Sequence, residues 1–363
     1  MKISVRNGTY RSYAKRLGLL FGSTVFAVGL VDLLLHFGFS LLPSPLDELI
    51  WESRQARHNV GRTVKQVAIP LPPESKADVL VVGDSFPFGF NVRASETFPA
   101  LIEESTGRKV VNLSVIGTSP VQYNRMLEVG FRYQPKLVVY CLFANDLVTG
   151  DAAEFSLARS EGRAPVGLLA DQDLFVESLS SDLKREIFYR RLQHCSVLWT
   201  LSQWLKHPVQ SRKRFDYVDK HRHMVLVGGN FWRRRLDWEM RGVAEGVKST
   251  IEVVVAASHL AKANEVEFRV VLIPSKEMVY GPLLADDKGS EIGYRSHLRT
   301  YREAVRMLEA EAVRVIDLTE SLQRAAMGGH RLYFTFDAHF DASGHRWVAQ
   351  ELRERLGIYP ESD

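Results

Sequence analysis

The chain has 363 residues, of which 45% are hydrophobic, 25% charged and 10% aromatic, and this excludes disordered, collagen-like and low-complexity proteins. The 47 Lys and Arg against 43 Asp and Glu give a net charge of +4, too balanced to indicate a nucleic-acid partner. Two cysteines, Cys141 and Cys195, are too few for a disulfide framework, although a single bond between them stays open. Because no Cys/His cluster has metal-ligand spacing, we expect no metal or other cofactor.

The N-terminal region differs from the rest of the chain. Residues 17–42 are apolar, with Asp32 and His36 as the only ionisable side chains, and are long enough to cross a membrane. Five basic residues and no acidic one precede them. This predicts a cytoplasmic tail over 1–16, a transmembrane anchor over 17–42 in the inner (cell) membrane, and a periplasmic remainder. The alternatives are a cleaved signal peptide or a buried amphipathic helix.

Asp32 lies inside this apolar segment. A carboxylate at the centre of a membrane costs about 2.5–3.5 kcal/mol on the insertion scale. Two interpretations follow: Asp32 lies towards the outer leaflet and is tolerated, or it contacts a helix of a partner in a biosynthetic complex.

A polar linker is expected over 43–76, and one domain over 77–357. Within that domain, Val-, Ile- and Leu-rich runs alternate with amphipathic patterns. The predicted strands are Asp78–Val82, Lys109–Leu113, Lys136–Phe143, Glu267–Ile273 and Val313–Leu318. The predicted helices are Ser95–Thr106, Pro120–Tyr133, Asp237–Ala263, Tyr294–Glu311 and Ser343–Leu356. This alternation predicts the α/β class, a three-layer α/β/α fold with a parallel sheet of about five strands, interrupted by an insertion over 150–236.

Polar residues follow three of these strands. Ser85 lies directly after the first strand, Gly117 after the second and Asn145 after the third. Parallel strands bring their carboxyl ends to one edge, so we expect these residues to lie close together. A serine on a sharp strand-to-helix turn exposes its hydroxyl there. A dinucleotide turn is excluded, because the GDSFPFG run at 83–89 lacks the required glycine spacing.

Asp337 and His339 precede the last predicted helix. With Ser85, a backbone N–H and the Asn145 amide, they complete the groups that acyl transfer needs: nucleophile, base, orienting acid and oxyanion donors. Each has a structural alternative, since Ser85 and Asn145 could cap helices and Gly117 could serve a turn. The alternative to His339 is His345, which we interpret as a solvated first-turn residue.

These residues give the chain a resemblance to a known family. Ser85 in GDSF, Gly117, Asn145 in AND and His339 follow the order of the four sequence blocks of the SGNH, or GDSL-type, hydrolases. The resemblance implies an SGNH/flavodoxin-like fold, with Ser85 as nucleophile, His339 as base and Asp337 as orienting acid. It also implies an oxyanion hole formed by the Ser85 and Gly117 N–H groups and the Asn145 amide.

One block departs from the usual pattern. The acid and histidine are spaced as D-x-H rather than D-x-x-H, and Asp341 is also near. The closer spacing is similar to that of alginate O-acetyltransferase-type relatives, although those place the serine after the Asp/His pair. This favours glycan acylation chemistry.

The resemblance therefore implies an ester hydrolase or O-acyltransferase that acts on small O-acyl, especially acetyl, esters of a surface polysaccharide. A transferase would need a multi-span membrane partner to deliver the acyl donor. The alternative is a non-catalytic glycan-binding or scaffold protein.

Several other residues keep two interpretations. Asp84 is expected to stabilise its turn and Asp146 its loop. Lys276 and Tyr280 either touch substrate or form loop contacts. The basic segment 206–241 either binds an anionic glycan or lipid headgroups, or is a solvated helical face, which we favour.

Overall fold

The computed structural model describes residues 7–38, 41, 50–52, 76–149, 152–153, 156, 197–198, 215–218, 224–227, 236–284, 294–335 and 337–360. Its centre is a five-stranded parallel sheet in the order β2-β1-β3-β6-β7. The strands are β1 (Val79–Val82), β2 (Val110–Asn112), β3 (Leu137–Leu142), β6 (Glu267–Leu272) and β7 (Val315–Asp317). The predicted fold class and all five predicted strands are confirmed.

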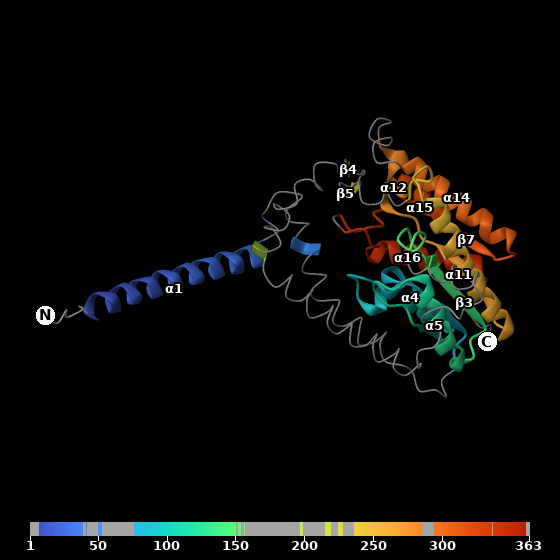
Figure 1. Ribbon diagram of the computed structural model, residues 1–363, viewed down its shortest axis with the longest axis horizontal. Coiled ribbons are helices and arrows are strands. Elements are labelled where there is room, and N and C mark those ends of the chain that lie inside the picture. Colours follow the sequence, from blue (N-terminus) through green and yellow to red (C-terminus); the bar gives the residue numbers. More distant parts are fainter. Residues whose placement is uncertain are drawn as a thin grey trace.

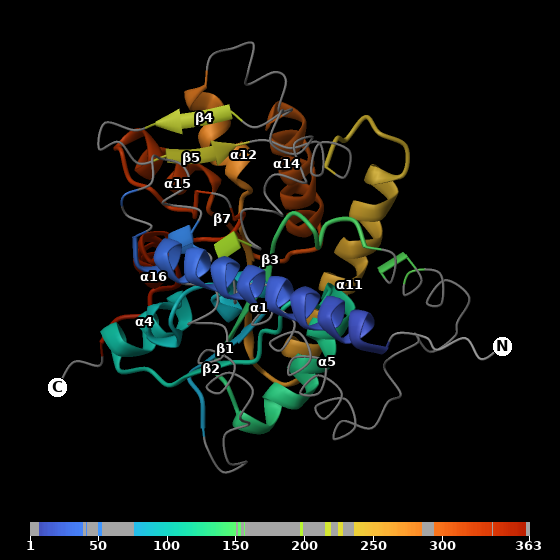
Figure 2. The same cartoon turned by 90° about the vertical axis from the view of Figure 1, so that its left-hand side faces the viewer.

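Helices cover both faces of the sheet (Figures 1 and 2). The helix α11 (Val243–Ala263) packs against both α5 (Pro120–Gly130) and α14 (Tyr294–Ala310), whereas α4 (Phe98–Thr106) packs against α16 (Ala342–Leu356). Tyr140 in β3 points to the face of the sheet that α5 covers, because its hydroxyl donates to the Pro120 carbonyl of α5 at 2.9 Å. The five predicted helices are confirmed, with shifted ends.

The shifted start of α11 has a local cause. The sequence pattern predicts a helix from Asp237, but Asp237–Gly242 forms turns, and Gly242 adopts a left-handed conformation with φ of 86°. The serine turn opens the short helix α3 (Ser85–Phe88), and η3 (Phe131–Tyr133) forms the end of the predicted helix over 120–133. Within the described residues, α12 (Lys276–Tyr280), η4 (Gly281–Leu283) and α15 (Thr319–Met327) were not predicted.

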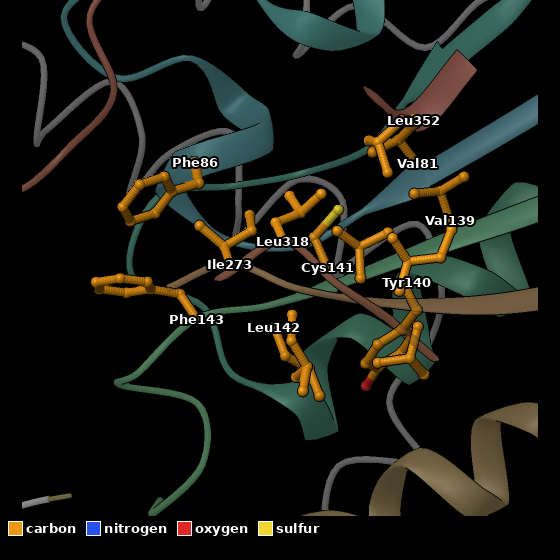
Figure 3. Close-up of a cluster of buried hydrophobic side chains, with 14 of the residues drawn as sticks. Val81, Phe86, Val139, Tyr140, Cys141, Leu142, Phe143, Ile273, Leu318 and Leu352 are labelled. Carbon is orange, nitrogen blue, oxygen red and sulfur yellow. The ribbon is translucent and has the colours of Figure 1, made fainter. Parts of the chain in front are cut away.

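The core lies on both sides of β3 (Figure 3). All six residues of β3 are buried, as a central parallel strand requires. In Figure 3, Tyr140 and Leu142 point to one side, and Val139 and Cys141 point towards Val81 and Leu352 on the other. Cys141 is a buried free thiol whose pKa is raised by burial, as its apolar setting predicts. Cys195 lies outside the described residues.

The N-terminal helix α1 (Asn7–Gly38) projects away from the α/β body (Figure 1). Its segment Arg16–Leu35 is long and apolar enough to cross a membrane, by length and composition, and none of that segment is buried. Asp32 accepts a hydrogen bond at 2.9 Å from the Leu198 backbone N–H, which belongs to the insertion. The carboxylate therefore has a partner within its own chain.

Only parts of the predicted linker and insertion are described. In the linker, Ile50 and Glu52 are buried against the domain. In the insertion, β4 (Phe215–Val218) and β5 (Met224–Val227) form an antiparallel hairpin that was not predicted, and β5 lies near α12. Most of the basic segment 206–241, including Arg233–Arg235, lies outside the described residues.

A substitution at Gly344 would test how closely α16 packs against the backbone of Leu332. A Cβ atom at this position would lie 2.0 Å from the Leu332 carbonyl oxygen, too close for any side chain. We expect Gly344→Ala to lower the free energy of unfolding by about 1–3 kcal/mol, because α16 must move away from that backbone. Thermal unfolding of the full chain measures this effect. Gly18→Ala is the control, since a Cβ there meets nothing within 4 Å; equal stability of the two variants would contradict the packing argument.

Candidate active site

The turn after β1 presents Ser85 at the carboxyl edge of the sheet. Ser85 begins the short helix α3, and the Asp84 carboxylate caps this helix by accepting the Phe86 N–H at 3.3 Å. Gly83 precedes them in a tight position, because a Cβ there would lie 2.6 Å from Pro87 and 3.0 Å from Cys141. The expected role of Asp84 in stabilising the turn agrees with this geometry.

Ser85, His339 and Asp337 form a continuous chain of hydrogen bonds. The Ser85 Oγ lies 2.7 Å from Nε2 of His339, and Nδ1 of His339 lies 2.5 Å from Oδ1 of Asp337. The same Oδ1 also accepts the His339 backbone N–H at 2.9 Å. Since the carboxylate fixes the proton on Nδ1, Nε2 is left as an acceptor that faces the serine hydroxyl.

Two phenylalanine rings hold the imidazole of His339 in place. The ring centroids of Phe86 and Phe90 lie 4.9 and 4.5 Å from that of His339. Phe86 belongs to the serine-bearing helix, so the nucleophile and its histidine are packed by the same short element. Aromatic faces also interact favourably with a cation, which suits a ring that gains a proton.

Asp337 is held in its charged form. Burial by itself would raise the pKa of this carboxyl, but the neighbouring His339 and Lys276 outweigh burial and lower the pKa from 3.8 to about 2. The carboxylate is therefore ionised at any pH at which the protein is expected to work. Lys276, for which the sequence allows a substrate contact or a loop contact, thus acts on the orienting acid through its charge.

Asn145 is joined to the serine turn through Asp84. Its Nδ2 donates to Oδ2 of Asp84 at 3.0 Å, and the Ser85 hydroxyl lies 3.2 Å from the same oxygen. One amide hydrogen of Asn145 remains for another acceptor. The hydroxyl has a single proton, and its shorter contact is with His339.

Asp146 holds the loop that carries Asn145. Its side chain accepts the Tyr123 hydroxyl at 2.8 Å and the Phe143 N–H at 2.8 Å. Its backbone carbonyl accepts the Thr250 hydroxyl at 3.0 Å. Asp146 thus supports the loop, as expected, and ties it to both α5 and α11.

Gly117 lies in the loop after β2, at the same edge of the sheet. It is exposed and has φ of 75°, a left-handed conformation that favours glycine. The loop is tied to the serine turn by a 3.1 Å hydrogen bond from the Val115 N–H to the Gly83 carbonyl. Within the part of the chain that the structure describes, neither the Gly117 N–H nor the Ser85 N–H donates a hydrogen bond.

The prediction that His345 is solvated is wrong. Its side chain is buried beside Phe98 and Phe340, and its Nδ1 accepts the Phe98 N–H at 3.2 Å. The reason is that α16 packs on α4, so that this imidazole caps the amino end of α4. Asp341, the other acid near His339, caps α16 instead and pairs with Arg331 at 3.0 Å.

The burial of His345 predicts a pH dependence of stability. Burial, with a smaller electrostatic contribution from the neighbouring His339, lowers the pKa of His345 from 6.5 to about 3. The unfolded chain therefore binds a proton near pH 6.5 that the folded chain excludes. We expect the free energy of unfolding to fall as the pH drops from 6.5 towards 3, by at most about 1.4 kcal/mol per pH unit from this group.

The measurement is the unfolding free energy of the full chain between pH 7 and 4.5, a range above the titration of Asp337. His345→Asn is the comparison, because its amide oxygen can still accept the Phe98 N–H but does not titrate. A slope as steep in this variant as in the unsubstituted chain would rule out His345 as the cause.

Comparison with known proteins finds a family model that matches part of this site. The family model described as the SGNH hydrolase-like domain of the acetyltransferase AlgX matches residues 233–359. This stretch includes Asp337 and His339 and spans the elements from α11 to α16. The SGNH resemblance is confirmed. A comparison with curated proteins finds no match.

Two solved structures to which the chain is similar have low sequence identity and low TM-scores. A GDSL-like lipase from Bacteroides thetaiotaomicron is 11% identical with a TM-score of 0.38, and the match covers 83% of this chain and 98% of the lipase. A catalytic mutant of an acetylxylan esterase from Geobacillus stearothermophilus is 11% identical with a TM-score of 0.41, covering 80% and 98% of the two chains. Likenesses of this size assign neither an activity nor a substrate to the SGNH-like chain.

The remaining candidates have structural contacts. Lys276 is buried and donates to the Thr335 carbonyl at 3.0 Å, and the Tyr280 hydroxyl lies 3.4 Å from the His330 carbonyl oxygen. Among the described residues, no group of three or more His, Cys, Asp or Glu side chains is placed to hold a metal ion.

Proposed function

We propose that the chain is a serine-dependent ester hydrolase or O-acyltransferase that acts on small O-acyl esters. The observation that carries the proposal is the continuous Ser85–His339–Asp337 hydrogen-bond chain at the carboxyl edge of the sheet. An SGNH hydrolase-like family match that includes the histidine and the acid supports it. All the groups that the chemistry needs come from this chain: Ser85, Gly117 and Asn145 from the loops after β1, β2 and β3, and Asp337 and His339 from one shared loop.

In the first step, His339 Nε2 takes the proton of Ser85 as Oγ attacks the acyl carbonyl. The new C–O bond makes a tetrahedral oxyanion. The Ser85 and Gly117 N–H groups and the second amide hydrogen of Asn145 donate to this oxyanion. The imidazolium that forms is stabilised by Asp337, whose charge the site maintains.

In the second step, the imidazolium of His339 gives its proton to the leaving alcohol, and the acyl group stays on Ser85. Water or a sugar hydroxyl then attacks the acyl-serine while His339 again takes the proton; the bond between the acyl carbon and Oγ breaks, and His339 returns the proton to Ser85. Water gives hydrolysis, and a sugar gives transfer. The two activities share every residue named and differ only in the acceptor.

The proposed substrate is an acetyl ester, with a surface polysaccharide as donor or acceptor. Its support is the D-x-H spacing of the acid and histidine and the acetyltransferase named in the family description. The proposed location is outside the cytoplasm, with α1 as a single membrane anchor after a basic segment. In the transferase form, a multi-span membrane partner would deliver the acyl donor.

The test is intact-mass spectrometry of the full chain in detergent after brief exposure to an activated acetyl ester and an acid quench. We expect one added acetyl group in the unsubstituted chain and none in Ser85→Ala. Ser105→Ala is the control, because its hydroxyl lies on the far part of α4 and bonds only the local Ile102 carbonyl. Candidate sugars added before the quench separate transfer from hydrolysis.

Absence of any adduct and of any alcohol release from the folded chain would reject the esterase mechanism. It would favour the alternative, a non-catalytic glycan-binding or scaffold protein that keeps the fold.

Asn145 provides a second, independent test. We expect Asn145→Ala to lower kcat about 10²–10³-fold, the usual loss when one oxyanion donor is removed, with little change in KM. Steady-state hydrolysis of the activated acetyl ester measures this loss. Asn264→Ala, which removes an amide from the exposed end of α11, should keep the full rate. An Asn145→Ala rate within a few-fold of the unsubstituted chain would remove Asn145 from the oxyanion hole.

A further inference from the structure

Two charged side chains from distant parts of the chain hold the backbone of Thr335, two residues before Asp337. The Thr335 N–H donates to the carboxylate of Glu52, and the Thr335 carbonyl accepts from Nζ of Lys276 at 3.0 Å. Thr335 is fully buried, and only 7% of Glu52 and 5% of Lys276 are exposed. The Glu52 carboxylate, the backbone of Thr335 and the Lys276 ammonium are therefore joined by hydrogen bonds inside the protein.

Burying the two charged side chains destabilises the fold unless each of them keeps a hydrogen-bond partner. A buried charge without a partner loses several kcal/mol of solvation, and hydrogen bonds to a charged group are about twice as strong as neutral ones. Here the negative group faces the N–H and the positive group faces the C=O, so each charge meets the favourable end of a peptide dipole. We call Glu52, Thr335 and Lys276 the Thr335 clamp.

The clamp is strengthened by contacts beside it. Ile50 is fully buried, and the Trp51 ring lies 6.4 Å from that of Phe334 between centroids. The Arg331 guanidinium lies over the Trp51 ring, 6.0 Å from the ring centroid. Residues 50–52 therefore grip residues 331–335 with apolar, aromatic and charged groups together.

The gripped segment leads directly to the catalytic pair. Residues 332–334 lie antiparallel to residues 339–341, with the Phe334 N–H donating to the His339 carbonyl at 3.1 Å and the Asp341 N–H to the Leu332 carbonyl at 3.1 Å. Asp337 lies between these two paired segments in the chain. A shift of Thr335 would therefore move the Asp337–His339 pair relative to the Ser85 hydroxyl.

We propose that Glu52 and Lys276 are positioning residues that fix Asp337 and His339 through Thr335. The segment Ile50–Glu52, which follows α1 in the chain, thereby helps to position the catalytic residues. This inference rests on the proposed function for its effect on catalysis, but the clamp itself is a statement about the backbone of Thr335. It assigns the region just after the apolar helix a role beyond that of a linker.

Hydrogen exchange tests the clamp without reference to activity. In the full chain in detergent, we expect Glu52→Ala to speed exchange in peptides that contain Thr335 by roughly tenfold or more, because its N–H loses a charged acceptor. Glu52→Gln should keep most of the protection, since an amide oxygen still accepts the bond. Glu103→Ala is the matched control, because the Glu103 carboxylate also accepts a backbone N–H, that of Val110, at 2.7 Å.

The acylation burst with an activated acetyl ester tests the effect on catalysis. The burst amplitude counts competent sites, and the burst rate reports their geometry. We expect Glu52→Ala and Lys276→Met to lower the rate constant about tenfold at unchanged amplitude and KM, and Glu52→Gln to restore it to within a few-fold. Glu103→Ala should match the unsubstituted chain in both.

Three outcomes would overturn the inference. They are unchanged exchange at Thr335 in Glu52→Ala, a loss of burst amplitude at unchanged rate, and a loss in Glu52→Gln as large as in Glu52→Ala. The second would mean that Glu52 only supports folding, and the third that its oxygen as acceptor of the Thr335 N–H does not set the rate. No burst from the unsubstituted chain would instead reject the proposed function, and exchange at Thr335 would still decide whether the clamp exists.

Discussion

The hydrogen bond between Ser85 Oγ and His339 Nε2 joins residues 254 positions apart, and the rest of the body is arranged so that this bond can form. The serine is placed by the turn after β1 and the histidine by a loop that follows β7 and α15. Both reach the same edge because every strand of the sheet runs in the same direction. The bond therefore depends on the parallel register from β1 through β3 and β6 to β7.

Electrostatics at this edge set a second constraint. Asp84 and Asp337 bring carboxylates close to a serine that must itself carry negative charge as it reacts. Each is compensated by donors: the Phe86 N–H and Asn145 amide for Asp84, and both N–H groups of His339 for Asp337. Lys276 adds a nearby positive charge. The donors spread the negative charge before the reaction adds more.

Much of the fold could be predicted from the sequence because its signals are local. Buried parallel strands read as unbroken runs such as the LVVYCL of β3, and amphipathic helices lie between them. Ser85 and Asn145 could be nominated because strand ends in such a sheet converge on one edge. His339 could be nominated because, with Asp337, it precedes the last helix and supplies the base that a serine nucleophile needs. The helix α12 and the hairpin β4–β5 could not, because each is short and stabilised by neighbours distant in sequence.

Burial was the harder property to predict. His345 sits in the first turn of a polar helix, a pattern typical of a solvated side chain, and only the packing of α16 on α4 buries it. Glu52 and Lys276 are likewise charged residues in polar surroundings in the sequence. Their burial follows from one shared partner, the backbone of Thr335, which no pattern of side chains in the sequence reveals.

The D-x-H spacing has a consequence for how such a site can be built. One oxygen of Asp337 receives both the backbone N–H and the ring N–H of His339, so three consecutive residues fix the acid, the imidazole and its tautomer together. The rest of the chain then has only to place this three-residue unit with its imidazole facing a serine. A unit so nearly self-contained is portable: it can be moved to another point in the chain, or joined to a serine in the opposite order, without rebuilding the geometry within it.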